Sequence, residues 1–451
     1  MEDHLPKSLL PQPRRARTIE HMNDEVVTLL RRLGVNKGAR HIRPASPPRP
    51  SDEAALHRGA PQPLETLLPG GRLEMCAEGA CFILDHVYPV HHHHGPDTLA
   101  GLLALEPGAV ARYVPGGGID GQQFRDFIFL DTETTGLAGA GALAFIVGVA
   151  YFEPQVVSLD GEATSREVLV SRQYFLRDHG DEVAMLHQLA DLLAGRAGLI
   201  TFNGRSFDVP LLDNRYLLNR MRSPLYDLAH IDLLPPARRL FRARLGSCSL
   251  SALEQNLLGI RRSHDDVPGW LIPSLYYDYL RSGDASQLAR VFYHNEMDVL
   301  SMVTLAARIF RQLGASRCDD PVDQMSLGRW QADLGLTDEA EATLRAALDG
   351  DLPLEAYHQT LYRLGALYKQ VGRRAEAVVA WQQIAFTSTG DVLAHVELAK
   401  HYEWHAADLA AAIRWTRAAL ELLERLPLTP NTRLVRAELN HRLERLQKKA
   451  G

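Results

Sequence analysis

Apolar residues follow two different spacings over residues 122–315. Short apolar runs predict strands, and a spacing of three to four residues predicts helices, one of them at 182–193. The expected strands lie at 127–130, 144–151, 167–175 and 199–202. Strands interleaved with helices are typical of layered α/β proteins. We therefore predict an α/β domain with a central mixed sheet that is mostly helical after residue 202.

Two regions precede this domain. Residues 1–60 are rich in Pro, Arg and Ser, and we expect a disordered, basic segment with one short helix at 23–33. Residues 62–120 are expected to form a small β-containing region. Its elements would be strands near 73–75 and 81–87, a Leu-rich helix near 98–105 and a linker at Gly116, Gly117 and Gly118.

A repeated pattern begins after residue 322. Gly-x3-Glu-Ala starts at Gly335 and again at Gly372, and a weaker copy with one inserted residue spans 406–412. The spacing is close to the roughly 34 residues of tetratricopeptide repeats, whose paired helices present a concave surface to a protein partner. We predict such repeats over 322–425 and a helical tail over 426–451, with a generic helical bundle as the alternative.

Two carboxylates follow the first strand of the α/β domain. Side chains two positions apart on a strand point to the same face, so Asp131 and Glu133 project together from the end of the apolar run. Like charges held this close are unfavourable unless a cation neutralises them, and Mg²⁺ or Mn²⁺ takes oxygen ligands of this kind. The alternative is that one carboxylate faces solvent and the other caps the next helix.

Three more polar residues are candidates to join this pair. Asp208 begins a predicted helix after the turn at Asn203-Gly204, and taken alone it would be an N-cap. His294 and Asp298 are four positions apart in a helical pattern, so they share one face. Taken alone, they would be an ordinary surface pair.

Taken in order, Asp-x-Glu, Asn-x3-Phe-Asp and His-x3-Asp resemble the three motifs of the DEDD family of 3′→5′ exonucleases. That family has an RNase H-like fold. The resemblance implies that Asp131, Glu133, Asp208 and Asp298 bind two divalent metal ions, Mg²⁺ or Mn²⁺. It also implies that His294 orients or deprotonates the attacking water. Two metals about 4 Å apart can hold both the attacking and the leaving oxygen of a phosphodiester.

The last motif departs from the family pattern in its register. In the histidine subclass the base usually lies five residues before the last Asp, and in the tyrosine subclass four residues before. Tyr293 occupies the first of these positions and His294 the second. We favour His294, because a neutral imidazole is a suitable base near pH 7, and keep Tyr293 as the competitor.

Further segments are similar to the YprB-type branch of these nucleases, namely 135–148, 232–241 and 265–273. The resemblance covers about residues 62–425. It implies a DNA exonuclease in repair or processing, with tetratricopeptide-like repeats that hold a protein partner, for which a helicase is one candidate. RNA as the substrate, a structure-specific endonuclease and a non-catalytic nucleic-acid-binding scaffold remain alternatives.

Composition narrows the functional classes. No lysine lies between Lys37 and Lys369, and no Gly-x-Ser-x-Gly elbow occurs, which argues against a P-loop, a lysine nucleophile or a serine hydrolase. Four cysteines are too few for a disulfide framework. The N-terminus is polar, and the longest apolar run, 143–152, is about half of a membrane span. We expect a cytoplasmic enzyme with no membrane segment.

Positive charge is concentrated in one segment, although the net charge is −6. Ten arginines and five acids lie between Arg205 and Arg262, and the arginines at 238, 239, 242 and 244 could contact phosphates or form a solvated helix face. The candidate nucleic-acid contacts are Thr132, Thr135, Gly136, Leu137, Asn203, Phe207, Arg238, Arg239 and Arg242.

Two features give weaker signals. Cys76, Cys81 and the run His91–His94 suggest zinc, but strand alternation would point the cysteines apart, so we expect a polar histidine loop. Asp265 and Asp266 are expected to cap the next helix, with a metal or supporting role as the alternative, and the role of Asp232 is open.

Overall fold

The computed structural model describes residues 64–114, 118–136, 141–159, 162–263, 266–388, 390–427 and 429–450. Several predictions lie outside these residues: the disordered segment 1–60 with its helix at 23–33, the linker residues Gly116 and Gly117, and the roles of Leu137 and Asp265.

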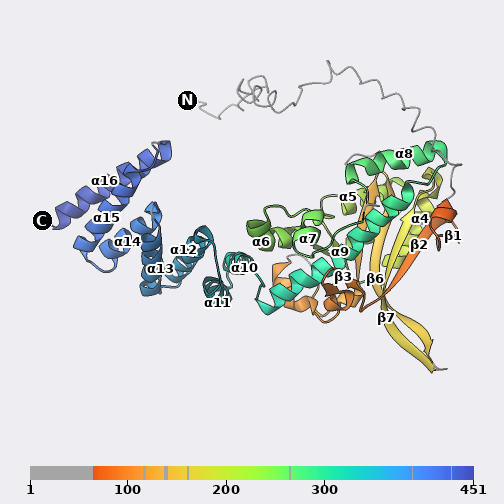
Figure 1. The fold of residues 1–451 in the computed structure, drawn as a ribbon, viewed down its shortest axis with the longest axis horizontal. Coiled ribbons are helices and arrows are strands. Elements are labelled where there is room, and N and C mark those ends of the chain that lie inside the picture. The colour runs from red at the N-terminus through yellow and green to blue at the C-terminus, as the bar shows by residue number, and fades with distance from the viewer. Residues whose placement is uncertain are drawn as a thin grey trace, which may run out of the picture. The chain divides into compact units, whose positions relative to one another are not determined.

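A seven-stranded mixed sheet forms the centre of the α/β region, in the order β1-β2-β7-β6-β5-β8-β9 (Figure 1). Neighbouring strands from β1 to β5 are antiparallel, and β5, β8 and β9 are parallel. The strands are β1 Arg72–Cys76, β2 Gly79–Pro89, β5 Phe127–Thr134, β6 Ala144–Leu159, β7 Glu162–Phe175, β8 Gly198–Thr201 and β9 Ala229–Asp232; β3 His93–His94 and β4 Asp97–Thr98 form a separate pair. The predicted fold class, an α/β domain with a mixed sheet followed by helices, is confirmed.

Both faces of the sheet are covered, because successive side chains of its central strand enter two different cores. Phe127 and Phe129 pack in one core and Ile128 and Leu130 in the other. This alternation explains why β5 begins as a continuous apolar run. The helices around the sheet are α3 Leu64–Leu67, α4 Glu182–Leu193, α5 Asp208–Leu218, α6 Leu234–Leu245, α7 Leu250–Asn256, α8 Ile272–Ser282 and α9 Leu288–Ala315.

Helix α9 belongs to both cores. Its first turns place Val291 and Phe292 in the core that contains α4 and α5, and its second half, from Val299 onward, packs in the core that contains α6 and α7. Figure 1 shows α9 running obliquely across the sheet. The segment between the two apolar halves therefore lies over the strand ends, where its polar residues meet β5.

The strands near residues 73–75 and 81–87 form as expected, but they do not form a sheet of their own. β1 and β2 extend the edge of the central sheet, because β2 pairs with β7 along eight residues, from Phe82 to Pro89. The predicted helix at 98–105 is wrong in type. The chain makes a short 3-10 helix there, η2 Leu99–Leu102, and a second one follows it, η3 Pro107–Tyr113, which begins at a proline.

The chain after residue 320 is helical and fits the predicted repeats of helix pairs. Its helices are α10 Pro321–Asp333, α11 Thr337–Leu348, α12 Leu354–Gln370, α13 Arg374–Thr387, α14 Val392–Trp404, α15 Leu409–Glu424 and α16 Pro430–Ala450. Gly335 and Gly372 turn the chain between paired helices with φ of +77° and +82°. The weaker third copy has Ala407 at φ +54° in the corresponding turn, a conformation that favours glycine.

Helix α10 joins the repeats to the α/β region. Trp330 packs in the same core as Phe127, and Arg244 of α6 bonds to the buried Asp323 with Nη2–Oδ2 of 2.6 Å. Among the described residues, no helix combines the length and the apolar character needed to cross a membrane.

Candidate active site

The predicted carboxylates come from three elements that meet at the end of β5. Asp131 and Glu133 extend the face of β5 that carries Phe127 and Phe129, Asp208 begins α5, and Asp298 lies on α9. The pKa of Asp131 is raised well above its ordinary value, first by burial and then by the charges of Asp298, Asp208 and Glu133. Four carboxyl groups therefore share one space, in which Asp208 is buried and the other three are partly buried.

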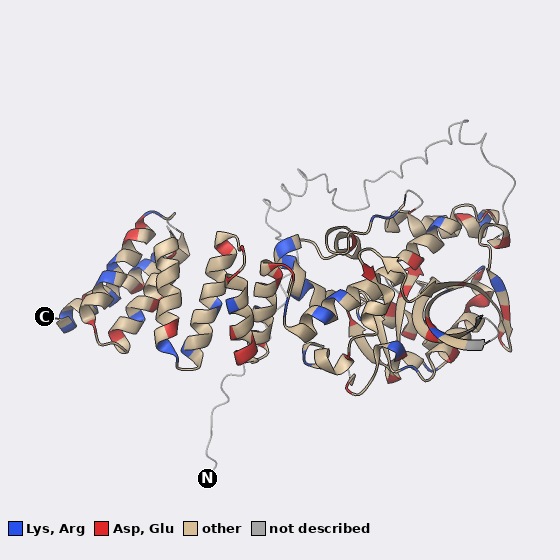
Figure 2. Ribbon diagram, turned by 60° about the horizontal axis from the view of Figure 1, so that its bottom comes forward, with Lys and Arg blue, Asp and Glu red and all other residues tan. Residues whose placement is uncertain are grey.

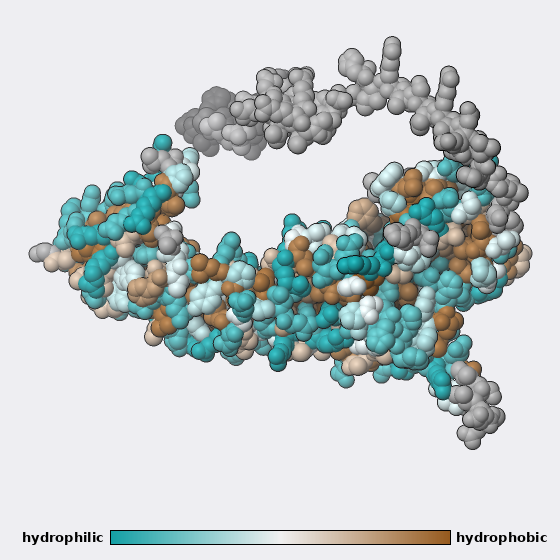
Figure 3. Space-filling model, in the orientation of Figure 1, coloured by the Kyte–Doolittle hydropathy of each residue, from teal (hydrophilic) through white to brown (hydrophobic). Residues whose placement is uncertain are grey.

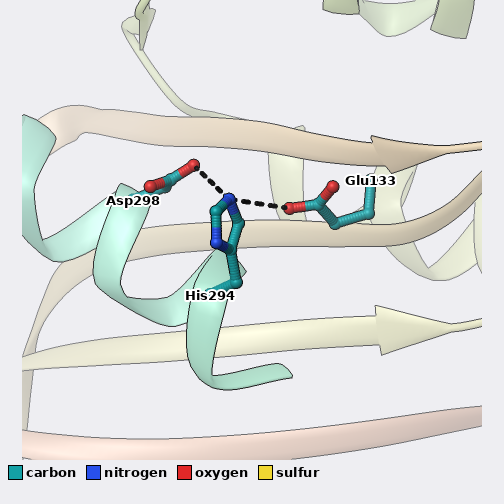
Figure 4. A group of neighbouring side chains, drawn as sticks. All are labelled: Glu133, His294 and Asp298. Carbon is teal, nitrogen blue, oxygen red and sulfur yellow. Dashed lines mark ion pairs between the residues drawn. The ribbon is translucent and has the colours of Figure 1, made fainter. Parts of the chain in front are cut away.

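The tightest part of this group is Glu133, His294 and Asp298, whose ligand atoms lie within 4.8 Å of one another. The His294 ring stands between the two carboxylates, with Nε2 at 4.0 Å from Glu133 Oε1 and 3.6 Å from Asp298 Oδ2 (Figure 4). Asp131 and Asp208 are outside this triplet. Asp208 is held by Thr132, whose hydroxyl donates to Asp208 Oδ1 at 2.6 Å.

The pKa shifts of the carboxylates indicate that the site lacks positive charge. The pKa of Glu133 is raised well above its ordinary value by burial and by Asp298 and Asp208, and burial raises the pKa of Asp208 to about 6. Both shifts mean that the ionised carboxylates are destabilised by the fold. The donor set is oxygen-rich with one imidazole, which suits a hard divalent cation such as Mg²⁺ or Mn²⁺.

The two candidate bases are placed differently. His294 Nδ1 lies 2.7 Å from Asp266 Oδ1, so the ring is oriented from behind while Nε2 faces the carboxylates. The Tyr293 hydroxyl instead accepts the backbone N–H of Ser263 at 3.1 Å. Only His294 of this pair enters the cluster of carboxylates.

Asn295 supports the cluster, and the sequence analysis missed it. This fully buried amide donates to Asp131 Oδ2 at 2.9 Å and accepts from Gln173 at 2.9 Å. Gly148 lies opposite Asp131 in the register of β5 and β6, and a Cβ there would overlap the Asn295 amide. The glycine therefore lets α9 approach the sheet, although the sequence contains no local signal that links residues 148 and 295.

Arg262 is the second residue that the sequence analysis missed, since it was counted only as one of ten arginines. Its guanidinium pairs with Asp298 and makes two bonds to the buried Glu254, with Nε–Oε2 of 2.9 Å and Nη2–Oε1 of 2.6 Å. Its pair with Asp298 brings a positive charge to the edge of the carboxylate cluster. Arg262 and Glu254 lie on different elements, so spacing could not have paired them.

Asp232, whose role the sequence did not predict, stabilises the backbone of a turn. Its carboxylate accepts the backbone N–H groups of Asn203 at 2.8 Å, Arg205 at 3.2 Å and Leu234 at 3.0 Å. Asn203 has φ of +67°, so Asp232 stabilises an unusual turn directly before Asp208. Asp266, expected to cap a helix, bonds to His294 instead, because the α7–α8 loop folds over α9.

Two hollows flank Asp298. One of about 620 Å³ is lined by Asp131, Asn203, Arg238 and Arg242, and one of about 910 Å³ by Glu254, Arg262 and His294. Arg239 and Arg244 are engaged elsewhere, with Asp333 at 3.0 Å and Asp323 at 2.6 Å. Of the arginines at 238–244, only Arg238 and Arg242 therefore border the carboxylates.

The remaining candidate nucleic-acid contacts that the structure describes lie on the turns beside the carboxylates. The Thr135 hydroxyl accepts from Leu143 N–H at 2.9 Å, and Gly136 O accepts from Thr134 Oγ1 at 2.9 Å, so both residues shape the turn after β5. Phe207 is 49% exposed next to Asp208. An exposed aromatic ring at this place is available to stack on a base.

The residues that suggested zinc do not belong to the triplet of Glu133, His294 and Asp298. His94 is buried, with Nε2 at 2.9 Å from Ser301 Oγ, and burial lowers its pKa to about 4. Within the described part of the chain, Cys76, Cys81 and His91–His94 are in no group of three metal-ligand side chains.

Comparison with known proteins agrees with this architecture. A family model described as the RNase H superfamily matches residues 128–310, which include all four carboxylates and His294. The chain is 30% identical over 352 residues to the uncharacterized protein YprB of Bacillus subtilis (strain 168), an alignment that covers 75% of this chain and 80% of YprB. The chain therefore belongs to the YprB family and carries a nuclease-type domain of the RNase H superfamily.

Proposed function

We propose that this protein is a divalent-metal-dependent 3′→5′ exonuclease that hydrolyses phosphodiester bonds, with DNA as the favoured substrate. The observation that carries this proposal is the convergence of four carboxylates and His294 at the end of β5. The pKa values of Asp131 and Glu133 are raised mainly by burial and by the neighbouring carboxylates, so the site is unbalanced without cations.

Asp131, Glu133, Asp208 and Asp298 would hold two Mg²⁺ or Mn²⁺ ions. Such ions neutralise the carboxylates, activate a water and stabilise the charge on the reacting phosphate. Asn295 would keep Asp131 oriented from one side, and Thr132 would keep Asp208 oriented from another, through bonds of 2.9 and 2.6 Å. Each of these bonds engages one named oxygen, Oδ2 of Asp131 and Oδ1 of Asp208.

His294 would take the proton of the attacking water at Nε2. Nε2 is the ring nitrogen on the side of the carboxylates, and Nδ1 is engaged on the other side by Asp266 at 2.7 Å and by Arg262 Nη1 at 3.2 Å. A neutral imidazole is matched to this task near pH 7. Tyr293 is less suited, since its hydroxyl is occupied by the backbone of Ser263.

The nucleic acid would approach along the hollow bordered by Arg238 and Arg242. Arg238 and Arg242 could neutralise phosphates, Asn203 and the turn at Thr135 and Gly136 could contact the backbone, and Phe207 could stack on a base. Preference for DNA rests on the resemblance to a branch linked to DNA repair and processing.

The helical repeats would bind a protein partner, with a helicase as one candidate. Large apolar side chains are exposed on successive helices, including Leu354 at 60%, Phe386 at 78% and Trp404 at 54%. Figure 3 shows hydrophobic residues interspersed with hydrophilic ones over this part of the surface. A partner with a complementary apolar segment would cover them.

The deciding experiment is degradation of 5′-labelled single- and double-stranded DNA and RNA in Mg²⁺, Mn²⁺ or EDTA, with Asp131→Ala as the control. Stepwise shortening that requires metal and is absent in the variant would support a 3′→5′ exonuclease and identify its substrate. Discrete internal fragments would indicate an endonuclease. Binding without cleavage under any metal would favour the non-catalytic scaffold.

A further inference from the structure

The loop between α7 and α8 brings Asp266 to the back of the His294 ring, outside the three motifs that carry the carboxylates. The two side chains are bonded, with His294 Nδ1 and Asp266 Oδ1 at 2.7 Å. An ionised carboxylate can only accept, whereas Arg262 Nη1, a donor, lies farther from Nδ1, at 3.2 Å; the shorter contact with Asp266 therefore places the hydrogen of the neutral ring on Nδ1. Nε2 then carries the free lone pair and faces Glu133 and Asp298.

This tautomer is not the one that the rest of the site favours. Glu133 and Asp298 lie 4.0 and 3.6 Å from Nε2, and both carboxylates would attract a hydrogen to that nitrogen. A ring protonated at Nε2 cannot accept a proton there from water. Asp266 supplies the competing acceptor at Nδ1, so it decides which nitrogen is available for the reaction.

Arg262 holds Asp266 in this position. Its guanidinium is 12% exposed, bonded twice to the buried Glu254, and Nη1 lies 3.7 Å from Asp266 Oδ2. Because Glu254 also accepts from Ser301 of α9 at 2.6 Å, this clamp ties the loop to the helix that carries His294. Asp266 is thereby fixed relative to the ring it contacts.

We propose that Asp266 is a positioning residue that acts through His294, fixing the ring orientation and its Nδ1–H tautomer for attack on the phosphodiester. This inference rests on the proposed nuclease function and adds a residue to it. Asp266 is engaged behind the ring by His294 and Arg262 and does not belong to the triplet of Glu133, His294 and Asp298. Its loss should therefore slow the chemical step without weakening metal or substrate binding.

The test is a double-mutant cycle on the full chain with Asp266→Ala, His294→Ala and the double variant. For each variant, kcat and KM are measured on the labelled DNA. Carboxylates that orient a metal-ligating histidine are worth about 10- to 100-fold in metal affinity or activity, and we take the same order for a carboxylate that orients a histidine base. We expect Asp266→Ala to lower kcat by that factor with KM and the Mn²⁺ midpoint unchanged. Asp266→Asn should fall between wild type and Ala, because its amide oxygen can still accept from Nδ1–H.

The decisive comparison is the double variant against His294→Ala. Equal rates would support action through the histidine, because the partner has nothing left to orient. A double variant slower by the whole Asp266→Ala factor would overturn the inference, and so would an Asp266→Ala rate within about twofold of wild type. Asp278→Ala, on the exposed Asp278–Arg281 pair of α8, is the matched control and should be unaffected. An inactive wild type would overturn the proposed function itself and this inference with it.

Discussion

Two buried groups of charges in this protein are balanced in opposite ways. In the helical repeats, the Glu403 carboxylate is fully buried and is met by three cations of α16: Arg442 at 2.6 Å, Arg445 at 2.7 Å and Lys449 at 3.3 Å. Figure 2 shows basic residues along this C-terminal helix. At the end of β5, in the described part of the chain, the guanidinium of Arg262 pairs with Asp298, one of the four carboxylates, and is shared with Glu254.

The difference separates a structural role from a functional one. A buried carboxylate with its own cations is neutralised by the fold and stabilises the contact between α14 and α16. A buried group of carboxylates with too few cations destabilises the metal-free fold, and such an arrangement is expected where an external cation is part of the function. The same residue type therefore has opposite effects on stability in the two regions.

The largest effect should follow from removing one carboxylate of the acidic site. We expect Asp131→Asn to lower hydrolysis at least about 1,000-fold, because a metal ligand supplies several kcal/mol of transition-state stabilisation. The metal-free variant should melt at or above the temperature of wild type, since a like charge is removed. Thermal melts in EDTA beside the gel assay check both outcomes; wild-type hydrolysis in Mn²⁺ would contradict the ligand assignment.

The histidine of the acidic site should have the next largest effect. We expect His294→Ala to lower kcat by about 100-fold or more, as is typical for loss of a general base, and Tyr293→Phe to change it less than about threefold. Single-turnover rates of the two variants in the same Mn²⁺ concentration make the comparison. The opposite order would assign the base to Tyr293.

A substitution at Glu403, whose charge is balanced by cations of α16, should lower the free energy of unfolding and leave catalysis unchanged. Glu403→Ala leaves three cations without their acceptor, and we expect a loss of about 2–4 kcal/mol in the unfolding of the helical region. Urea unfolding followed by circular dichroism measures it, with Glu421→Ala on the exposed face of α15 as control. Activity per folded molecule should stay at the wild-type level; a stability change equal to that of the control would refute the comparison.

The smallest effect is the pH dependence of the metal-free acidic site. The pKa of Asp208 is raised by burial to about 6, so the folded chain binds this proton more tightly than the unfolded chain. The stabilisation is complete below about pH 4 and is lost as the pH rises through 6, by on the order of 1–3 kcal/mol. In EDTA, Asp208→Asn should therefore stabilise the protein more at pH 7.5 than at pH 5.

Thermal melts of wild type and Asp208→Asn at the two pH values measure this difference. Added Mn²⁺ should stabilise wild type more than the variant at pH 7.5. An equal gain of the variant at both pH values would show that Asp208 is not destabilised by the fold.

Local periodicity by itself determined much of the site. The period of a strand places Asp131 and Glu133 on one face, and the period of a helix places His294 and Asp298 on one face. An apolar run before each of the first two motifs predicted the strands β5 and β8. These features depend only on neighbours within a few residues, so they can be predicted from the sequence.

The surroundings of those residues depend on contacts between elements that are far apart in the sequence. The tertiary structure joined β1 and β2 to the central sheet, brought Asn295 over Gly148, paired Arg262 with Glu254 and placed Asp266 behind His294. It also used Arg239 and Arg244 to hold α10, which left Arg238 and Arg242 at the site. These pairings join residues on different elements, and their free energy comes from burial and hydrogen bonding that exist only once the chain is packed.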